Sequence, residues 1–347
     1  MKYRSNFIAI ICLSIFAFVA FNTIDTPNTN KEIQNNHEWD QVEEIVVGRW
    51  VRDAFEIPMI SENVKNLYPY ISDSSFNYMG RAQGHILADI YPQDDQEFYT
   101  EQENLVKVVE SLGVKVRRPE ELEVHSIATS QPYSRDPIIT IGNKVIIANM
   151  NLEARRLETA NYRRIALDLA KNYNGEVVNM PANKAGLHED NIYLEGGDVF
   201  VNGKEIYVGL SGNASNEAGV EWLQKELGDN YKVYGIQLQH HVLHLDCAMM
   251  LLNDHQGVVC KGDFVDFDAL PASLKKYEWV EVKPEQAQLM ATNGMVINDH
   301  TVIVSNAFPE VNNRIKALGI DVIEIPFRKA NYFGGGIRCS YQPIYRQ

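Results

Sequence analysis

Four short segments of the 347-residue sequence concentrate side chains that could take part in chemistry. Three of them directly precede a predicted β-hairpin, and the fourth lies near the C-terminus. They are Tyr133-Ser-Arg-Asp-Pro137, Leu194-Glu-Gly-Gly-Asp198, His244-Leu-Asp246 and Gly334-Gly-Gly-Ile-Arg-Cys339. If the hairpins are repeats of one unit and the units form a ring, their equivalent strand ends converge on one axis. This arrangement would gather the polar side chains in one central pocket, namely Asp136, Glu195, His244, Asp246 and Cys339.

These residue types suit attack on a guanidino group. A guanidinium is a planar cation whose N–H donors two carboxylates can bind as a fork. Its central carbon is a poor electrophile, so the attack needs a strong nucleophile such as a thiolate. A histidine can protonate the departing amine, and a further carboxylate can orient that histidine.

The spacing of these residues adds to this interpretation. Residues i and i+2 of a strand share one face, so His244 and Asp246 are expected to point into the same cavity. The glycines before Cys339 let the backbone approach a ligand closely, which favours an accessible thiol. Taken singly, each segment also has a structural interpretation, because Glu195-Gly-Gly-Asp198 could be a turn and Cys339 a buried thiol.

The net charge of the protein limits the classes of ligand that it is expected to bind. The sequence has 46 acidic and 32 basic residues, which gives a net charge of -14. Such a surface repels phosphate backbones, so nucleic-acid binding is not expected. It suits a cationic small substrate, although a solvated acidic surface has the same composition.

Four cysteines, at positions 12, 247, 260 and 339, do not form the framework of a disulfide-rich protein. The sequence has no CxxC motif and no His/Cys spacing typical of zinc, so no metal site is predicted.

The N-terminus has the pattern of an export signal. Lys2 and Arg4 precede an apolar run from Phe7 to Phe21, which is the length of a secretory segment and short for a membrane span. We therefore expect residues 1–24 to be a signal peptide or an N-terminal anchor, with residues 7–21 as the possible membrane tether. Residues 25–37 are polar and are expected to form a tether. The protein is predicted to be exported, either periplasmic or secreted.

A strand–turn–strand pattern recurs along the rest of the chain. Predicted hairpins cover residues 137–147, 198–208, 248–259 and 294–304, with Asn, Gly and Asp in their turns. Helical patterns follow at 152–171, 216–227 and 311–318, and each leads to another strand, at 176–180, 231–236 and 321–325. With a further strand at 43–48, the repeat fits a closed ring of about five α/β modules. An ordinary mixed α/β sheet is the alternative fold.

Several stretches together resemble the guanidino-group-modifying, or pentein, superfamily, and in particular its glycine amidinotransferase branch. They are residues 38–48, 135–142 with Arg155 and Glu158, 194–198, 219–222, 244–246 and 334–339. The resemblance covers nearly everything after residue 38 and implies a five-module, pseudo-symmetric α/β propeller with a catalytic domain at 38–347. It also implies an enzyme that uses no metal or organic cofactor.

The resemblance gives each site residue a role. Cys339 matches the nucleophile that forms a covalent amidino intermediate, His244 the acid/base, and Glu195 its carboxylate partner. Asp136 and Asp246 match the guanidinium clamp. An amidinotransferase would pass the amidino group of arginine to an amine acceptor. The Glu195-Gly-Gly-Asp198 motif is closer to the deiminase and methylarginine-hydrolase branches, and the only cation soon after Asp246 is Lys261. The alternatives are therefore a hydrolase that releases citrulline, an inactive guanidine-binding module and a purely structural exported protein.

Overall fold

The computed structural model describes residues 31–57, 69–121, 131–184 and 191–347. The expected signal or anchor at 1–24 lies outside the described residues. Within the described part of the chain, no helix is both long and apolar enough to cross a membrane.

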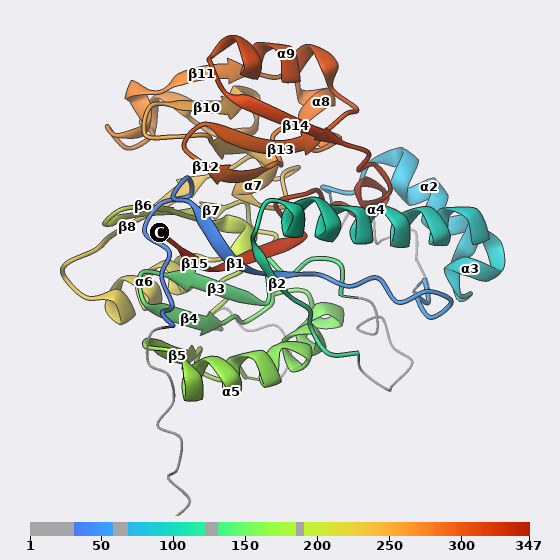
Figure 1. Cartoon of the computed structure of the whole chain (residues 1–347), viewed down its shortest axis with the longest axis horizontal. Coiled ribbons are helices and arrows are strands. Elements are labelled where there is room, and N and C mark those ends of the chain that lie inside the picture. Colours follow the sequence, from blue (N-terminus) through green and yellow to red (C-terminus); the bar gives the residue numbers. More distant parts are fainter. Residues whose placement is uncertain (1–30, 58–68, 122–130, 185–190) are drawn as a thin grey trace, which may run out of the picture.

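The fold is a mixed α/β structure built from five three-stranded sheets (Figure 1). In each sheet the central strand pairs antiparallel with one neighbour and parallel with the other. Four sheets follow one another along the chain. They are β3 (Ile138–Ile141), β4 (Lys144–Ile147) and β5 (Glu176–Asn179); β6 (Val199–Asn202), β7 (Glu205–Leu210) and β8 (Lys232–Gln237); β9 (Met249–Leu251), β10 (Gln256–Val259) and β11 (Glu278–Glu281); and β12 (Met295–Asn298), β13 (Thr301–Ser305) and β14 (Asp321–Ile325). The four predicted hairpins are thus confirmed.

The fifth sheet joins the two ends of the described chain. Strand β1 (Val42–Val47) is central, with β15 (Tyr341–Arg346) antiparallel on one side and β2 (Lys115–Arg117) parallel on the other. Because β15 begins two residues after Cys339, this pairing fixes the C-terminal segment against the N-terminal strand. The five sheets fit the five predicted modules.

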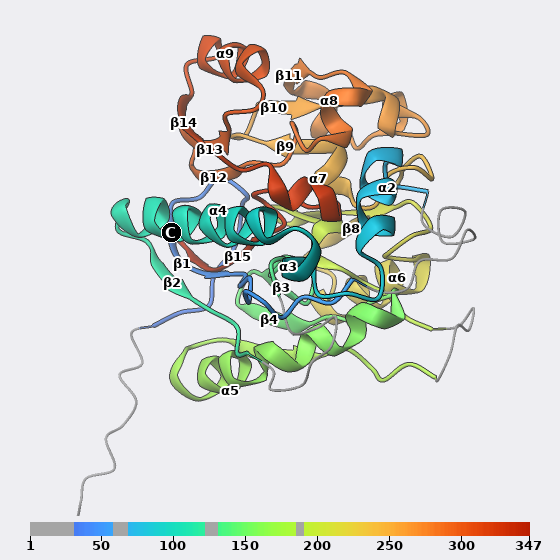
Figure 2. The same ribbon diagram turned by 90° about the vertical axis from the view of Figure 1, so that its right-hand side faces the viewer.

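Helices join the second and third strands of most modules (Figures 1 and 2). These helices are α2 (Asp73–Ala82), α3 (Leu87–Ile90) and α4 (Pro92–Ser111) before β2, α5 (Arg163–Asn172) before β5, α6 (Glu217–Leu227) before β8 and α9 (Pro309–Ala317) before β14. Among the described residues, the other two helices, α7 (Leu245–Ala248) and α8 (Pro284–Gln288), are short. The predicted helix at 152–171 begins as a 3₁₀ helix, Glu153–Tyr162, and continues as α5.

Helix α4 was not predicted, although its sequence explains it. Pro92 occupies the first turn together with Asp94 and Asp95, where a missing N–H and negative charge are both favourable. Phe98, Gln102, Leu105, Val106 and Val109 are buried and recur every three or four residues, which aligns them on one face. That face packs against the sheet of β1 and β15.

The apolar cores connect neighbouring sheets. One cluster contains Val46, Val145 and Ile344 and so joins the β1 sheet to the β4 sheet. A second joins the β4 and β7 sheets. A third extends through the β7, β10 and β13 sheets, and a fourth joins the β13 sheet to β1 and β15. Each sheet therefore shares a core with the next sheet along the chain, and the β13 sheet shares one with the β1 sheet.

The predicted tether is wrong for residues 31–37. Ile33 is 1% exposed and packs in the core cluster with Val46 and Ile344. Asn35 is also buried, and its side chain donates to the carbonyl of Thr140 at 2.8 Å. Bridges to residues 142, 174, 202 and 345 hold this segment on the domain. Burying a side chain such as that of Ile33 contributes about 1.5–3 kcal/mol to the stability of the folded state. This contribution favours a packed segment despite the polar composition around it.

Candidate active site

The five predicted site residues come from segments that precede the first strand of a module. Asp136 precedes β3, Glu195 precedes β6, His244 and Asp246 precede β9, and Cys339 precedes β15. All five side chains are between 0 and 3% exposed. Four of them line a cavity of about 470 Å³, namely Asp136, Glu195, His244 and Cys339. Asp246 is not part of the cavity wall and lies behind Cys339, with Oδ2 3.6 Å from Sγ.

The expectation that His244 and Asp246 share a strand face is wrong. His244 is the N-cap of α7, and Asp246 lies in the first turn of this helix. Positions two apart on a helical turn point to different sides of its axis, so the two side chains take different partners. His244 Nε2 lies 3.0 Å from Glu195 Oε2, whereas Asp246 Oδ2 accepts from Arg338 Nη1 at 3.2 Å.

His244 is a buried imidazole among carboxylates. Besides its contact with Glu195, its Nδ1 lies 3.8 Å from Asp136 Oδ1. Burial opposes charging of the ring, but Asp136 and the hydrogen bond to Glu195 outweigh it and raise the pKa of His244 to about 10. The resting site therefore holds an imidazolium at neutral pH, which is the form that can donate a proton.

Arg155 is the second cation of this cluster. It forms a two-pronged ion pair with Glu158, at 2.8 and 2.9 Å, and its Nη2 lies 2.9 Å from Asp136 Oδ2. Its Nη1 lies 3.8 Å from Glu195 Oε2. Burial disfavours the ionised form of Asp136, yet His244 and Arg155 outweigh this effect and hold its pKa below the usual value. Asp136 is thus a carboxylate at neutral pH.

The Cys339 thiol rests against one amide and one carboxylate. Asn293 Nδ2 donates to Cys339 Sγ at 3.3 Å and to the Asp246 carbonyl at 3.1 Å, and Asn293 Oδ1 accepts from the Cys339 N–H at 3.2 Å. Burial, followed by the charges of Asp246 and Asp136, raises the pKa of Cys339 well above its usual value. The thiol is consequently protonated at neutral pH.

A buried ion-pair chain lies behind the thiol. Arg338 pairs with Asp246 at 3.2 Å and with Glu38 Oε2 at 3.1 Å, and its guanidinium lies 3.8 Å from the Phe200 ring centroid. Arg338 is 1% exposed, so these two carboxylates must offset the free-energy cost of burying its positive charge. Asp246 thus already holds one guanidinium, which belongs to the protein.

Three of these residues, Asn293, Arg155 and Arg338, have no role predicted from the sequence. Asn293 stands two residues before β12, the position that Asp136 and Cys339 hold before β3 and β15. The repeat could have identified it, since each of the five modules supplies a residue two to five positions before its first strand. Arg155 and Glu158 are three residues apart, which aligns them on a 3₁₀ helix. Nothing in the sequence indicates that Arg338 pairs with Glu38.

Asp136, Glu195 and His244 also form a possible metal site. Within the described part of the chain they are the one group of at least three His, Cys, Asp or Glu whose ligand atoms lie close enough, within 4.8 Å of one another. Arg155 already contacts both carboxylates of this group at 2.9 and 3.8 Å. The donor set is therefore neutralised by a protein cation and does not need an ion.

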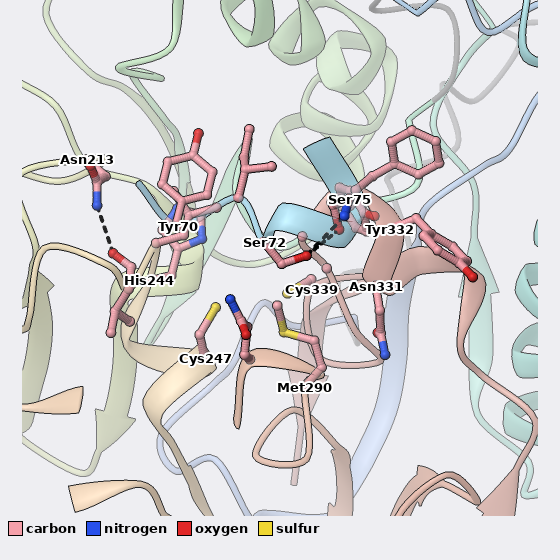
Figure 3. Close-up of a pocket in the computed structure, with 18 of the residues that line it drawn as sticks. Tyr70, Ser72, Ser75, Asn213, His244, Cys247, Met290, Asn331, Tyr332 and Cys339 are labelled. Carbon is pink, nitrogen blue, oxygen red and sulfur yellow. Dashed lines mark hydrogen bonds between the residues drawn. The ribbon is translucent and has the colours of Figure 1, made fainter. Parts of the chain in front are cut away.

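The cavity widens beyond these polar groups. Figure 3 shows the side chains of Cys247, Met290 and Cys339 pointing toward the same part of it. Cys247 is a second buried thiol, with Sγ 3.7 Å from Asp246 Oδ1. The two thiols thus contact the two oxygens of one carboxylate.

A family model described as N,N dimethylarginine dimethylhydrolase, eukaryotic, matches residues 87–346. The chain belongs to this family of guanidino-modifying enzymes. It is an enzyme of the amidinotransferase or C–N hydrolase kind.

Relatives of this guanidino-modifying enzyme match most of its length. The L-arginine:L-lysine amidinotransferase of Pseudomonas savastanoi pv. phaseolicola is 25% identical, over 89% of this chain and 93% of the relative. Mitochondrial glycine amidinotransferase of Gallus gallus is 24% identical, over 90% of this chain and 82% of the relative.

Solved structures share the fold. An amidinotransferase from Microseira wollei in the saxitoxin biosynthetic pathway superposes with a TM-score of 0.77 at 22% identity, over 91% of this chain and 97% of that chain. A mutant DDAH from Pseudomonas aeruginosa in complex with citrulline has a TM-score of 0.63 at 18% identity, over 87% of this chain and 99% of that one.

The state of His244 is directly measurable. In protein with isotope-labelled histidine, NMR should show His244 still protonated at pH 8, and Asp136→Asn should lower its pKa because it removes an anion that favours the imidazolium. Since this pKa is raised above an unfolded value of about 6.5, the stabilisation is complete below that pH and is lost as the pH rises toward about 10. Asp299→Asn, an exposed change, is the control. A neutral His244 at pH 7 would contradict the assignment.

Proposed function

We propose that the enzyme is an amidinotransferase, which moves the amidino group of arginine or a related guanidine to an amine through a covalent intermediate on Cys339. The observation that carries this proposal is the convergence of the Cys339 thiol, the protonated His244 and the Asp136 carboxylate on one cavity. The near full-length similarity to amidinotransferases supports an amine as acceptor.

In the first half-reaction a guanidinium binds beside Asp136, with Asp246 acting from behind Cys339. The arriving positive charge opposes the effects of burial and of Asp246, so Cys339 releases its proton to solvent. The thiolate attacks the guanidino carbon and a C–S bond forms. His244, oriented by Glu195, gives its proton to the departing nitrogen as the C–N bond breaks. An amine leaves, and the amidino group stays on sulfur.

In the second half-reaction the neutral His244 acts as a base. It takes a proton from the acceptor amine as that nitrogen attacks the amidino carbon. The C–S bond then breaks, the new guanidine leaves as a cation, and Cys339 can take up a proton again. No step needs an oxidant or a reductant.

Hydrolysis is the second candidate. In that reaction the small terminal amine leaves first, the rest of the substrate stays on Cys339 as an alkylated amidino group, and water then releases a ureido product such as citrulline. The family model bears the name of a dimethylarginine hydrolase, and the Glu195-Gly-Gly-Asp198 turn is the motif we associate with hydrolytic branches. The two reactions differ in which nitrogen of the guanidine leaves first and in whether an amine or water then attacks the intermediate on Cys339.

The nucleophile can be tested against a matched thiol. Cys339→Ala should reduce kcat by at least about 10³-fold, since the covalent route is lost. Mass spectrometry of enzyme quenched during turnover should find an amidino group on Cys339. Cys247→Ala is the control, because Cys247 is equally buried, lines the same cavity and contacts the same carboxylate. It should still carry the group on Cys339. A Cys339→Ala enzyme with wild-type turnover would refute the covalent route.

Product analysis separates transfer from hydrolysis. With arginine alone we expect about one equivalent of ornithine per enzyme and then only slow release of urea, because water is poorly placed. With an added amine such as glycine or lysine we expect faster ornithine release without matching ammonia, and ping-pong kinetics. Rapid citrulline formation that no added amine alters would rule out the transferase and leave the hydrolase.

The five modules are further proposed to close into a pseudo-symmetric propeller. The core clusters that connect successive sheets, and the cluster shared by the β13 sheet with β1 and β15, support closure. An experimental structure in which the β13 and β1 sheets do not touch would contradict it.

Export is also proposed, from the basic and apolar segment Lys2 to Phe21. Cell fractionation should find the protein outside the cytoplasm. Full-length chain that is freely soluble in the cytoplasm would contradict this proposal.

A further inference from the structure

The basic side chains that line the cavity already face carboxylates of the protein. Among the described lining residues they are Arg155, His241 and His244. Arg155 pairs with Asp136 and Glu158, His244 contacts Glu195, and His241 Nε2 lies 3.1 Å from Asp263 Oδ1. The wall also carries Glu285. The lining is therefore acidic in sum, and its described cations face anions of the protein.

Lysines next to the cavity are committed in the same way. Lys261, the only cation soon after Asp246 in the sequence, pairs with Glu281 at 3.0 Å and is not among the lining residues. Lys329 pairs with Asp94 at 2.6 Å and Glu97 at 3.0 Å. A carboxylate on the substrate would compete with these partners.

One side of the cavity is apolar and aromatic. Its lining includes Trp50, Phe55, Ile57, Met79 and Phe333. The rings support one another, with centroids 4.8 Å apart for Trp50 and Phe55 and 5.2 Å apart, edge to face, for Phe55 and Phe333. A methylene chain on this wall gains roughly fourfold in affinity per buried group. A carboxylate there would lose its hydration without gaining a cation.

We infer that the preferred guanidino substrate is an alkylguanidine whose tail carries no carboxylate. The inference rests on the proposed function and names the substrate class of the same site. The guanidinium lies at Asp136 and Cys339, and the alkyl chain lies along the aromatic wall. An ammonium at the far end of the chain is compatible with the acidic wall at Asp263 and Glu285, and with the faces of nearby aromatic rings.

The test compares three guanidines. Arginine carries a carboxylate and an ammonium on its tail, agmatine carries only the ammonium, and butylguanidine carries neither group. The adduct on Cys339 and kcat/KM are measured for each. Agmatine and butylguanidine should exceed arginine in kcat/KM by about tenfold or more, the scale of one unpaired charge. Arginine equal to or better than both would overturn the inference and leave the proposed function intact.

Binding measured without chemistry keeps the two proposals apart. Calorimetry on Cys339→Ala should give the same order of affinities, so the preference is testable even if no guanidine modifies Cys339. In that case the proposed function fails, whereas the order of affinities still supports or overturns the inferred substrate class.

A charge change at the rim provides a second readout. Glu285→Lys adds a cation to the wall and should shift the agmatine-to-arginine ratio of kcat/KM toward arginine by about tenfold. Glu221→Lys makes the same change on the exposed face of α6, outside the lining, and should leave the ratio unchanged. Equal agmatine-to-arginine ratios in the two variants would contradict the inference that the acidic wall of the cavity disfavours a carboxylate on the substrate.

Discussion

The concentration of carboxylates in a buried cavity is the constraint on which the site depends. Asp136, Glu195 and Asp246 surround a thiol that must itself become an anion to react. Buried carboxylates are tolerated only when cations neutralise them, and Arg155, His244 and Arg338 do so. In the resting enzyme these charges nearly balance. Ionising Cys339 then requires one more cation, and a guanidinium is the cation that the proposed reaction supplies.

The repeat explains how one chain assembles this site. Each module places a polar residue just before its first strand, and these are Asp136, Glu195, His244, Asn293 and Cys339. Strands β3, β6, β9, β12 and β15 are thus equivalent supports for five different functional groups. Strand β15, which follows Cys339, is held in place by its pairing with β1. The position of the nucleophile therefore relies on a contact between residues about 300 positions apart.

The sequence predicts this organisation well where local signals exist. The hairpins follow from β-branched runs around Asn- and Gly-containing turns, and four of the five site residues were assigned correctly to one cavity. The fifth, Asp246, was misplaced because the residues after His244 form a helical turn, which a strand-like spacing does not reveal. The link from Glu38 to Arg338 was not predictable, since many carboxylates in the chain could pair with any one arginine. The burial of Ile33 was not predicted either, because its apolar partners lie in strands that are distant in the sequence.

The most direct test of this account is the ionisation of Cys339 with and without a bound cation. The ultraviolet absorbance of the thiolate can be titrated in Cys247→Ala protein, with the Cys247→Ala/Cys339→Ala double variant subtracted as background. The free enzyme should show no thiolate from Cys339 at neutral pH, because burial and the charge of Asp246 raise its pKa. Saturation with an unreactive guanidinium ligand should produce the thiolate signal at the same pH. A signal already present in the free enzyme, or one that the ligand leaves unchanged, would contradict activation of the nucleophile by the substrate's own charge.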